Sequence, residues 1–163
     1  MLPTIVLGAL PGAPQWAARL ARIGLDVVAS GAQEDTAQTI AAARAAAPHL
    51  AVKARMIDAA GLGDARGVIV ETAGDVPAGV YRLGEDDAAI EGVDGSSDEI
   101  EDVMDVARRT LGAARDGVPS ALWVVATPGL DLLPDDVVAA KLVALADGAR
   151  QARLYLAKEQ FDI

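Results

Sequence analysis

Residues Leu122 to Tyr155 read LWVVATPGLDLLPDDVVAAKLVALADGARQARLY. The first five of these residues are apolar, which predicts a buried strand over residues 122–126. Pro134 fits the first position of a helix. Apolar residues then recur at helical spacing up to about Tyr155, at Val138, Leu142, Leu145 and Ala149. A strand, a short loop and a long amphipathic helix form the repeating unit of an α/β fold.

The same alternation occupies the rest of the chain. Short apolar runs predict further strands at residues 4–10, 25–30, 50–57, 68–72 and 80–83, and helical patterns occupy residues 14–23 and 34–47. Strands that alternate with helices of about ten residues or more are joined by crossovers, which pair the strands in parallel. The sequence therefore predicts an α/β fold of about six parallel strands, with residues 1–163 in a single domain.

The clearest helix is predicted between Ser96 and Gly117. Ser96 and Glu99 have the spacing of a capping box, in which the two side chains satisfy backbone N–H groups of the first turn. The apolar residues that follow predict its buried stripe: Ile100, Val103, Met104, Ala107 and Leu111. The acidic residues 84–95 before this helix are predicted to form the longest loop.

Composition narrows the range of functions. The chain has 163 residues, a net charge of -10, one histidine and no cysteine. Without cysteine there is no disulfide, no thiolate nucleophile and no thiolate ligand for a metal or cluster. A negative surface repels phosphate backbones and anionic lipids, so neither nucleic acid nor a membrane is an expected partner. Because a basic leader and an apolar run of about 18 residues are both missing, we expect a cytoplasmic location.

Candidate site residues follow from the rule that ligands bind at the carboxyl ends of parallel strands. The residues placed there are Gly8, Ala9, Gly31, Asp58, Glu71 and Glu85. Glu71 ends an apolar run, where a carboxylate can bind a metal, act as a base or face solvent. The lone His49 is expected on the opposite side of the sheet, so no triad or histidine metal cluster is indicated. Asp94 and Asp98 do not fit a calcium loop and are interpreted as a solvated acidic face.

Six segments in chain order carry a resemblance to one family. They are residues 2–11, 24–31, 52–54, 68–72, 77–81 and 122–130, the last followed by the similar helical residues 140–142 and 148–150. Together they resemble the catalytic barrel of cobalamin-independent methionine synthase, collinearly across nearly the whole chain. The resemblance implies a TIM-barrel-like (β/α) fold, here reduced to about six parallel strands.

The departures from that family concern its chemistry. Two further strands implied between residues 57 and 67, which would carry an Asp-Glu-Pro motif and His-x-Cys zinc ligands, are missing. Of the implied zinc ligands only Glu71 is present, and the cysteine expected near Pro128 is absent. Ala9 and Ala32 replace a serine and a glutamate of the family. One carboxylate cannot hold zinc and activate a thiol, so we expect no bound metal, no other cofactor and no active zinc methyltransferase.

Two hypotheses follow from this pattern. The first is a degenerate, non-catalytic domain that acts as an interaction or regulatory subunit, either as a homo-oligomer or with a related methyltransferase. The strands at residues 50–57 and 68–72 flank the missing part and either pair directly or remain exposed edges that recruit a partner, and the second outcome is favoured. The acidic residues 85–105 would attract a basic partner.

The alternative hypothesis keeps the pocket and changes its chemistry. The chain would then be a small-molecule binding protein for a thiol or folate-type ligand, or a methyltransferase with altered chemistry. Glu71, Asp58 and Glu85 would converge on the ligand, and Gly8 and Gly31 would let it approach the backbone.

Overall fold

The computed structural model describes the chain in several parts. These are residues 4–6, 27–29, 51–54, 68–70, 80–82, 88–116 and 122–161, together with Trp16, Arg19, Arg22, Ile23, Leu25 and Ala45. Trp16 is buried, as its place in the predicted helical stripe requires, and the Arg19 guanidinium lies 4.5 Å from the centre of its ring.

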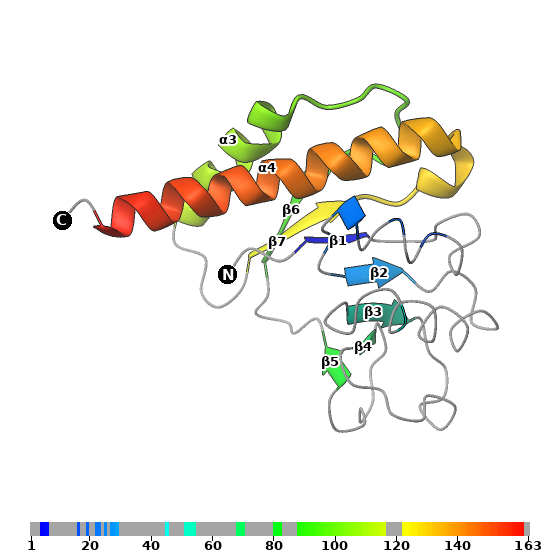
Figure 1. Cartoon of the computed structure of the whole chain (residues 1–163), viewed down its shortest axis with the longest axis horizontal. Helices are drawn as coiled ribbons and strands as arrows, with labels where there is room; N and C mark the ends of the chain where they lie inside the picture. The colour runs from blue at the N-terminus through cyan, green and yellow to red at the C-terminus, as the bar shows by residue number, and fades with distance from the viewer. Residues whose placement is uncertain are drawn as a thin grey trace.

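The described strands pair in parallel in two sheets. They are β1 (Thr4–Val6), β2 (Val27–Ala29), β3 (Ala51–Ala54), β4 (Val68–Val70), β5 (Val80–Arg82), β6 (Ala88–Val93) and β7 (Leu122–Ala126). One sheet has the order β2-β3-β4-β5 and the other β1-β7-β6, and β1 lies beside β2 (Figure 1). The expected α/β architecture with parallel strands is therefore confirmed.

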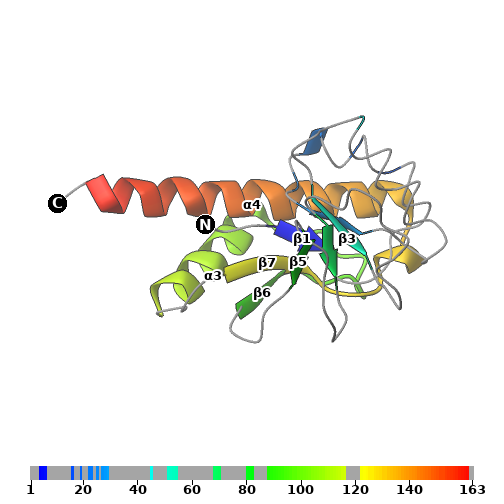
Figure 2. The ribbon, with the colours of Figure 1, turned by 90° about the horizontal axis from the view of Figure 1, so that it is seen from below.

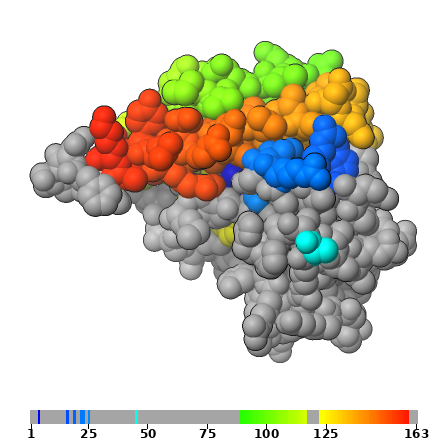
Figure 3. Space-filling view, viewed as in Figure 1, coloured from blue at the N-terminus to red at the C-terminus, as the bar shows by residue number. Residues whose placement is uncertain are grey.

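Two helices cover the three-stranded sheet. Helix α3 (Val103–Arg115) connects β6 to β7, and α4 (Asp135–Phe161) follows β7 after the short 3₁₀ helix η3 (Leu130–Leu132). The helices pack against each other and against β6 and β7. Helix α4 extends beyond the strands toward the C-terminus (Figures 1 and 2), and its outer surface is visible along its length beside α3 in Figure 3.

The core lies between these helices and the sheet. The predicted inner stripe of α4 is confirmed, because Val138, Leu142, Leu145 and Ala149 are all fully buried. A Cβ atom on Gly148 would lie 2.5 Å from Val106, so a glycine at this position lets α3 and α4 approach closely. Each fully buried aliphatic side chain of this core contributes about 1.5–3 kcal/mol. The long helix is therefore held by burial of its inner face.

The predicted loop at residues 84–95 is wrong in its second half, where the structure has β6. This strand pairs with β7 from Ala88 opposite Leu122 onward, with a bulge between Glu91 and Val93. The glycine at the bulge, Gly92, is buried, and a Cβ atom there would lie 2.4 Å from Leu145. Acidic residues around a short strand with a central glycine hide the alternation on which strand prediction depends.

The predicted start of the helix after β6 is also wrong. Asp102 is the N-cap of α3, and its carboxylate accepts hydrogen bonds from the N–H groups of Met104 (2.8 Å) and Asp105 (3.2 Å). Ser96 and Glu99 therefore do not form a capping box. Ile100 and Met104, 52% and 40% exposed, lie outside the buried face of α3, whose buried residues are Val106, Ala107, Thr110 and Leu111.

The two strands that flank the missing part of the resembled barrel pair directly. Strand β3 runs parallel to β4, with Val52 opposite Val68 and Ala54 opposite Val70. The favoured prediction of exposed edges at these strands is therefore wrong. Among the described strands, β5 pairs with β4 alone and β6 pairs with β7 alone. In the described part of the chain, no helix combines the length and hydropathy that a membrane crossing requires.

Candidate functional site

The candidate residues chosen from the sequence are Gly8, Ala9, Gly31, Asp58, Glu71 and Glu85, and all six lie outside the described residues. Their roles and their convergence on one ligand stay predictions. Of the predicted carboxyl ends of strands, the structure describes the side chains that follow β7, and it also describes those that follow the unpredicted strand β6. The site is built from these residues.

The carboxyl ends of β6 and β7 are held together closely. The Thr127 N–H donates to the Val93 carbonyl (3.1 Å), and the Gly95 N–H donates to Thr127 Oγ1 (2.9 Å). A Cβ atom on Gly95 would lie 2.0 Å from the Thr127 carbonyl oxygen. Gly129 has a φ of 121°, which disfavours residues with a side chain, and its Cβ would lie 2.7 Å from the Gly95 carbonyl oxygen. Glycine is therefore required on both loops.

A buried lysine of α4 holds residues 94–102, which connect β6 to α3. We call these residues the 94–102 segment. The Lys141 side chain is fully buried, and its Nζ lies 3.0 and 3.1 Å from the two carboxylate oxygens of Glu101. It also donates to the Glu99 carbonyl oxygen. An ammonium group has three donors, and all three are used here. Pairing of this kind is what makes a buried charge tolerable.

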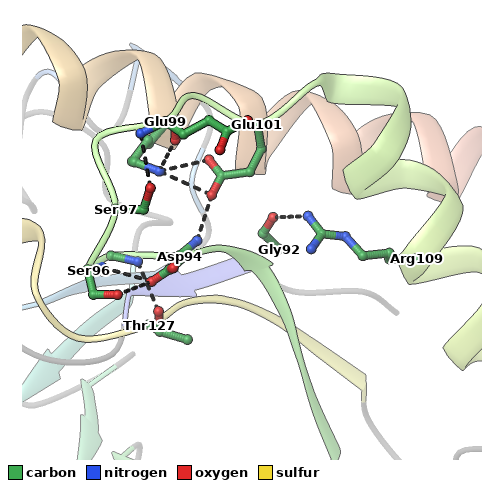
Figure 4. A network of polar contacts seen from close by, with 10 residues as sticks. Gly92, Asp94, Ser96, Ser97, Glu99, Glu101, Arg109 and Thr127 are labelled. Atoms are coloured by element: carbon green, nitrogen blue, oxygen red, sulfur yellow. Dashed lines mark hydrogen bonds and ion pairs between the residues drawn. The ribbon is translucent and has the colours of Figure 1, made fainter.

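The carboxylate of Glu101 links this lysine to Asp94 (Figure 4). Glu101 Oε1 accepts a hydrogen bond from the Asp94 N–H (2.7 Å). Asp94 Oδ1 in turn accepts from the hydroxyl (2.6 Å) and the N–H (2.8 Å) of Ser96. The Ser96 hydroxyl, then the Ser96 N–H, lowers the pKa of Asp94 below its ordinary value. Asp94 is therefore an ionised structural acceptor.

A pocket of about 410 Å³ opens beside this network. Five carboxylates and one cation are among its lining residues: Asp94, Ser97, Glu99, Ile100, Glu101, Asp102, Asp105 and Arg109. Most of the charges bond to the chain itself, since Arg109 donates to the Gly92 carbonyl (2.8 Å) and Asp105 pairs with Arg108 (2.8 Å). Within the described ranges, no group of three or more His, Asp or Glu residues is arranged to hold a metal ion.

Sequence reasoning missed Lys141 and Glu101 and treated Asp94 as solvated surface. One signal was available, because Lys141 falls on the apolar stripe of its helix, three residues after Val138 and four before Leu145. A lysine at such a position requires a buried anionic partner. The sequence does not name that partner, since Glu101 is 40 residues away along the chain.

Comparison with known proteins gives one distant likeness. No family model matches the chain, and no curated protein matches it. Among solved structures, the chain is similar to a B12-independent methionine synthase from Shewanella sp. W3-18-1 in complex with selenomethionine, with 19% identity and a TM-score of 0.38. The match covers 90% of this chain and 54% of the other, so the chain spans about half of that protein's length.

The zinc site implied by the resembled family does not fit the residues present. The chain has no cysteine to supply a thiolate and only one histidine, His49. Zinc sites in proteins use three or four ligands, of which thiolate and imidazole are the most common. The donor set therefore differs from the one that the resemblance implies.

Proposed function

We propose that the chain is a degenerate relative of the cobalamin-independent methionine synthase barrel, acting as an interaction or regulatory subunit. Its fold would be a reduced TIM-barrel-like (β/α) domain. The parallel pairing of the strands supports this, as does α3, which connects the parallel neighbours β6 and β7. A helix between two parallel strands is the repeating unit of such barrels.

The proposal that the chain is non-catalytic rests on the contacts of the charged groups near the ends of β6 and β7. These groups bind other groups of the chain. Lys141 pairs with Glu101, Arg109 binds the Gly92 carbonyl, and Asp94 accepts from Ser96. In enzymes of the barrel class these strand ends carry the catalytic residues. Here they hold the 94–102 segment to α4, α3 to β6, and Asp94 to Ser96 within the segment. The cysteine-free composition supports the same conclusion, because thiolate ligands for zinc cannot be supplied.

The proposed partner is a second copy of the chain or a related methyltransferase subunit. β3 pairs with β4, and β1 lies beside β2, so the end strands of the described sheets that support this proposal are β5 and β6. Ala89 and Glu91 of β6 are exposed. A strand edge with free N–H and C=O groups binds a further strand.

Sedimentation velocity at micromolar concentration tests the proposed assembly. We expect the chain alone to sediment as a homo-oligomer. If it is monomeric alone, we expect it to sediment as a complex when a related methyltransferase is added. Ala89→Lys should weaken that assembly, whereas Arg153→Lys on the far end of α4 should leave it unchanged. A chain that stays monomeric alone and with the methyltransferase would contradict the interaction role.

The alternative is a small-molecule binding protein, and the pocket of about 410 Å³ favours it. Titration calorimetry with a pterin, a folate and a thiol separates the two functions. Saturable binding of one molecule per chain would favour the alternative, and no heat with any of the three would favour the interaction subunit.

A further inference from the structure

The 94–102 segment is fastened at two places that differ in kind. At its beginning, the backbone of Gly95 packs against the loop after β7, where it bonds to Thr127. Near its end, Glu101 and the Glu99 carbonyl are held by Lys141 of α4. Between these two contacts the segment is open to solvent, with Ser96, Asp98, Glu99 and Ile100 exposed. The first contact depends on close backbone packing and the second on a single charge.

The two partners of the ion pair have unequal access to water. The Lys141 side chain is 0% exposed and the Glu101 side chain is 16% exposed. Lys141 belongs to a helix whose inner face is fully buried on both sides of it, at Val138 and Leu145. Solvation of the ammonium would require α4 to move. Solvation of the carboxylate requires only that the segment moves outward.

We propose that Lys141 is a latch that holds the 94–102 segment closed over the carboxyl ends of β6 and β7. When its positive charge is removed, the segment opens locally while the domain remains folded. The opening moves Glu101 and the Glu99 backbone away from α4 and changes the wall of the pocket, to which both residues belong. The latch is independent of the proposed function, because it needs neither a partner nor a ligand.

The opening should stop at Gly95. The Gly95 N–H bonds to Thr127 at the end of β7, and this contact involves neither Lys141 nor Glu101. The Asp94 N–H, by contrast, has Glu101 Oε1 as its acceptor and loses it when the segment moves outward. Two neighbouring amides therefore report on the two fastening points separately.

Amide hydrogen exchange of the Lys141→Met variant, followed by NMR, tests the latch. Methionine keeps the apolar length of the side chain and removes the charge. We expect the Asp94 N–H to exchange at least about tenfold faster, with Gly95 and the α4 residues Leu142 and Leu145 unchanged. Lys158→Met is the matched control, since Lys158 is an exposed lysine of the same helix, and it should leave all four amides unchanged.

Two results would overturn the proposal. One is an unchanged exchange rate at Asp94 in the Lys141→Met variant. The other is equal acceleration at Asp94, Gly95, Leu142 and Leu145, since this means that the lysine supports the whole domain and not one segment.

A second variant keeps the proposal testable if Lys141→Met fails to fold. Glu101→Gln retains the shape of the side chain and removes its charge, and it should accelerate exchange at Asp94 by a larger factor than at Gly95. The double variant should exchange at Asp94 no faster than the faster single variant, because both changes break one contact. Rate increases that multiply in the double variant would show that the two residues act separately.

Discussion

The two sheets differ in how they are supported. The β6–β7 ladder pairs strands of six and five residues and is covered by α3 and α4, whereas β2, β3, β4 and β5 have only three or four residues each. Short strands contribute few hydrogen bonds and depend on what packs against them. Residues 88–116 and 122–161, which we call the C-terminal unit, are therefore the part of the described structure with the longest strands and with helices packed on them.

The largest expected effect comes from removing the anionic partner of the buried lysine. Glu101→Leu leaves the Lys141 ammonium buried with only a backbone acceptor. The free energy of unfolding should fall by about 3–5 kcal/mol, measured by urea denaturation. Because β1 pairs with β7 and lies beside β2, both sheets should unfold in one transition.

The matched control is Glu159→Leu, which removes the partner of Arg115 from an exposed ion pair. Its effect should be below about 1 kcal/mol. Equal losses in the two variants would contradict the special role of the buried pair. Two separate transitions in the Glu101→Leu variant would show that the four-stranded sheet does not depend on the C-terminal unit.

A smaller effect is expected where the two loops approach each other. Gly129→Ala places a side chain at a φ of 121° and 2.7 Å from the Gly95 carbonyl oxygen. The backbone conformation alone should lower the free energy of unfolding by about 1–2 kcal/mol. Gly112→Ala is the control, since nothing lies within 4 Å of its added Cβ inside α3. That variant should gain about 0.5–1 kcal/mol, and a loss there would argue against the described packing.

Removal of the N-cap of α3 should lower the free energy of unfolding by a similar or smaller amount. Asp102→Ala removes the acceptor of two N–H groups and should cost about 1 kcal/mol in thermal denaturation. Asp102→Asn keeps an oxygen acceptor and should be nearly neutral. If Ser96→Ala costs more than Asp102→Ala, the helix begins earlier than described.

The smallest expected effect is a change in stability at acidic pH. The pKa of Asp94 is lowered in the folded chain, so the unfolded chain binds a proton there more readily. The contribution of Asp94 to stability is therefore present above its ordinary pKa of 3.8 and is lost as the pH falls below that value. Asp94→Asn should reduce the slope of stability against pH in this acidic range. Near pH 7 the slope should be unchanged. An unaltered acid dependence would contradict the bonding to Ser96.

Much of the fold could be predicted from local pattern. Apolar runs placed β1 to β5 and β7, and the spacing of Val138, Leu142, Leu145 and Ala149 identified the buried face of α4. Strand β6 was missed because Glu91 and Gly92 interrupt its apolar pattern. The helix start was misplaced because Ser96 and Glu99 imitate a capping box six residues before the true cap, Asp102.

The polar network could not be predicted in the same way. Each of its decisive contacts joins residues that are far apart in the chain, as when Gly95 bonds to Thr127 or Lys141 to Glu101. Local periodicity shows that Lys141 lies on a buried face, but only the packing of α4 against the 94–102 segment supplies its partner. The resemblance indicated Glu71, which lies outside the described residues. It did not indicate the carboxyl ends of β6 and β7, where this network lies.

The proposed non-catalytic role excludes zinc-dependent methyl transfer by the chain. The most direct measurement is transfer of a methyl group from a methylated folate to homocysteine by the purified chain with zinc supplied. We predict a rate equal to that without protein, for the chain as it is and for Glu71→Ala alike, because the thiolate ligands implied by the resemblance cannot be supplied. Turnover above that rate, lost in the Glu71→Ala variant, would contradict the proposed non-catalytic role.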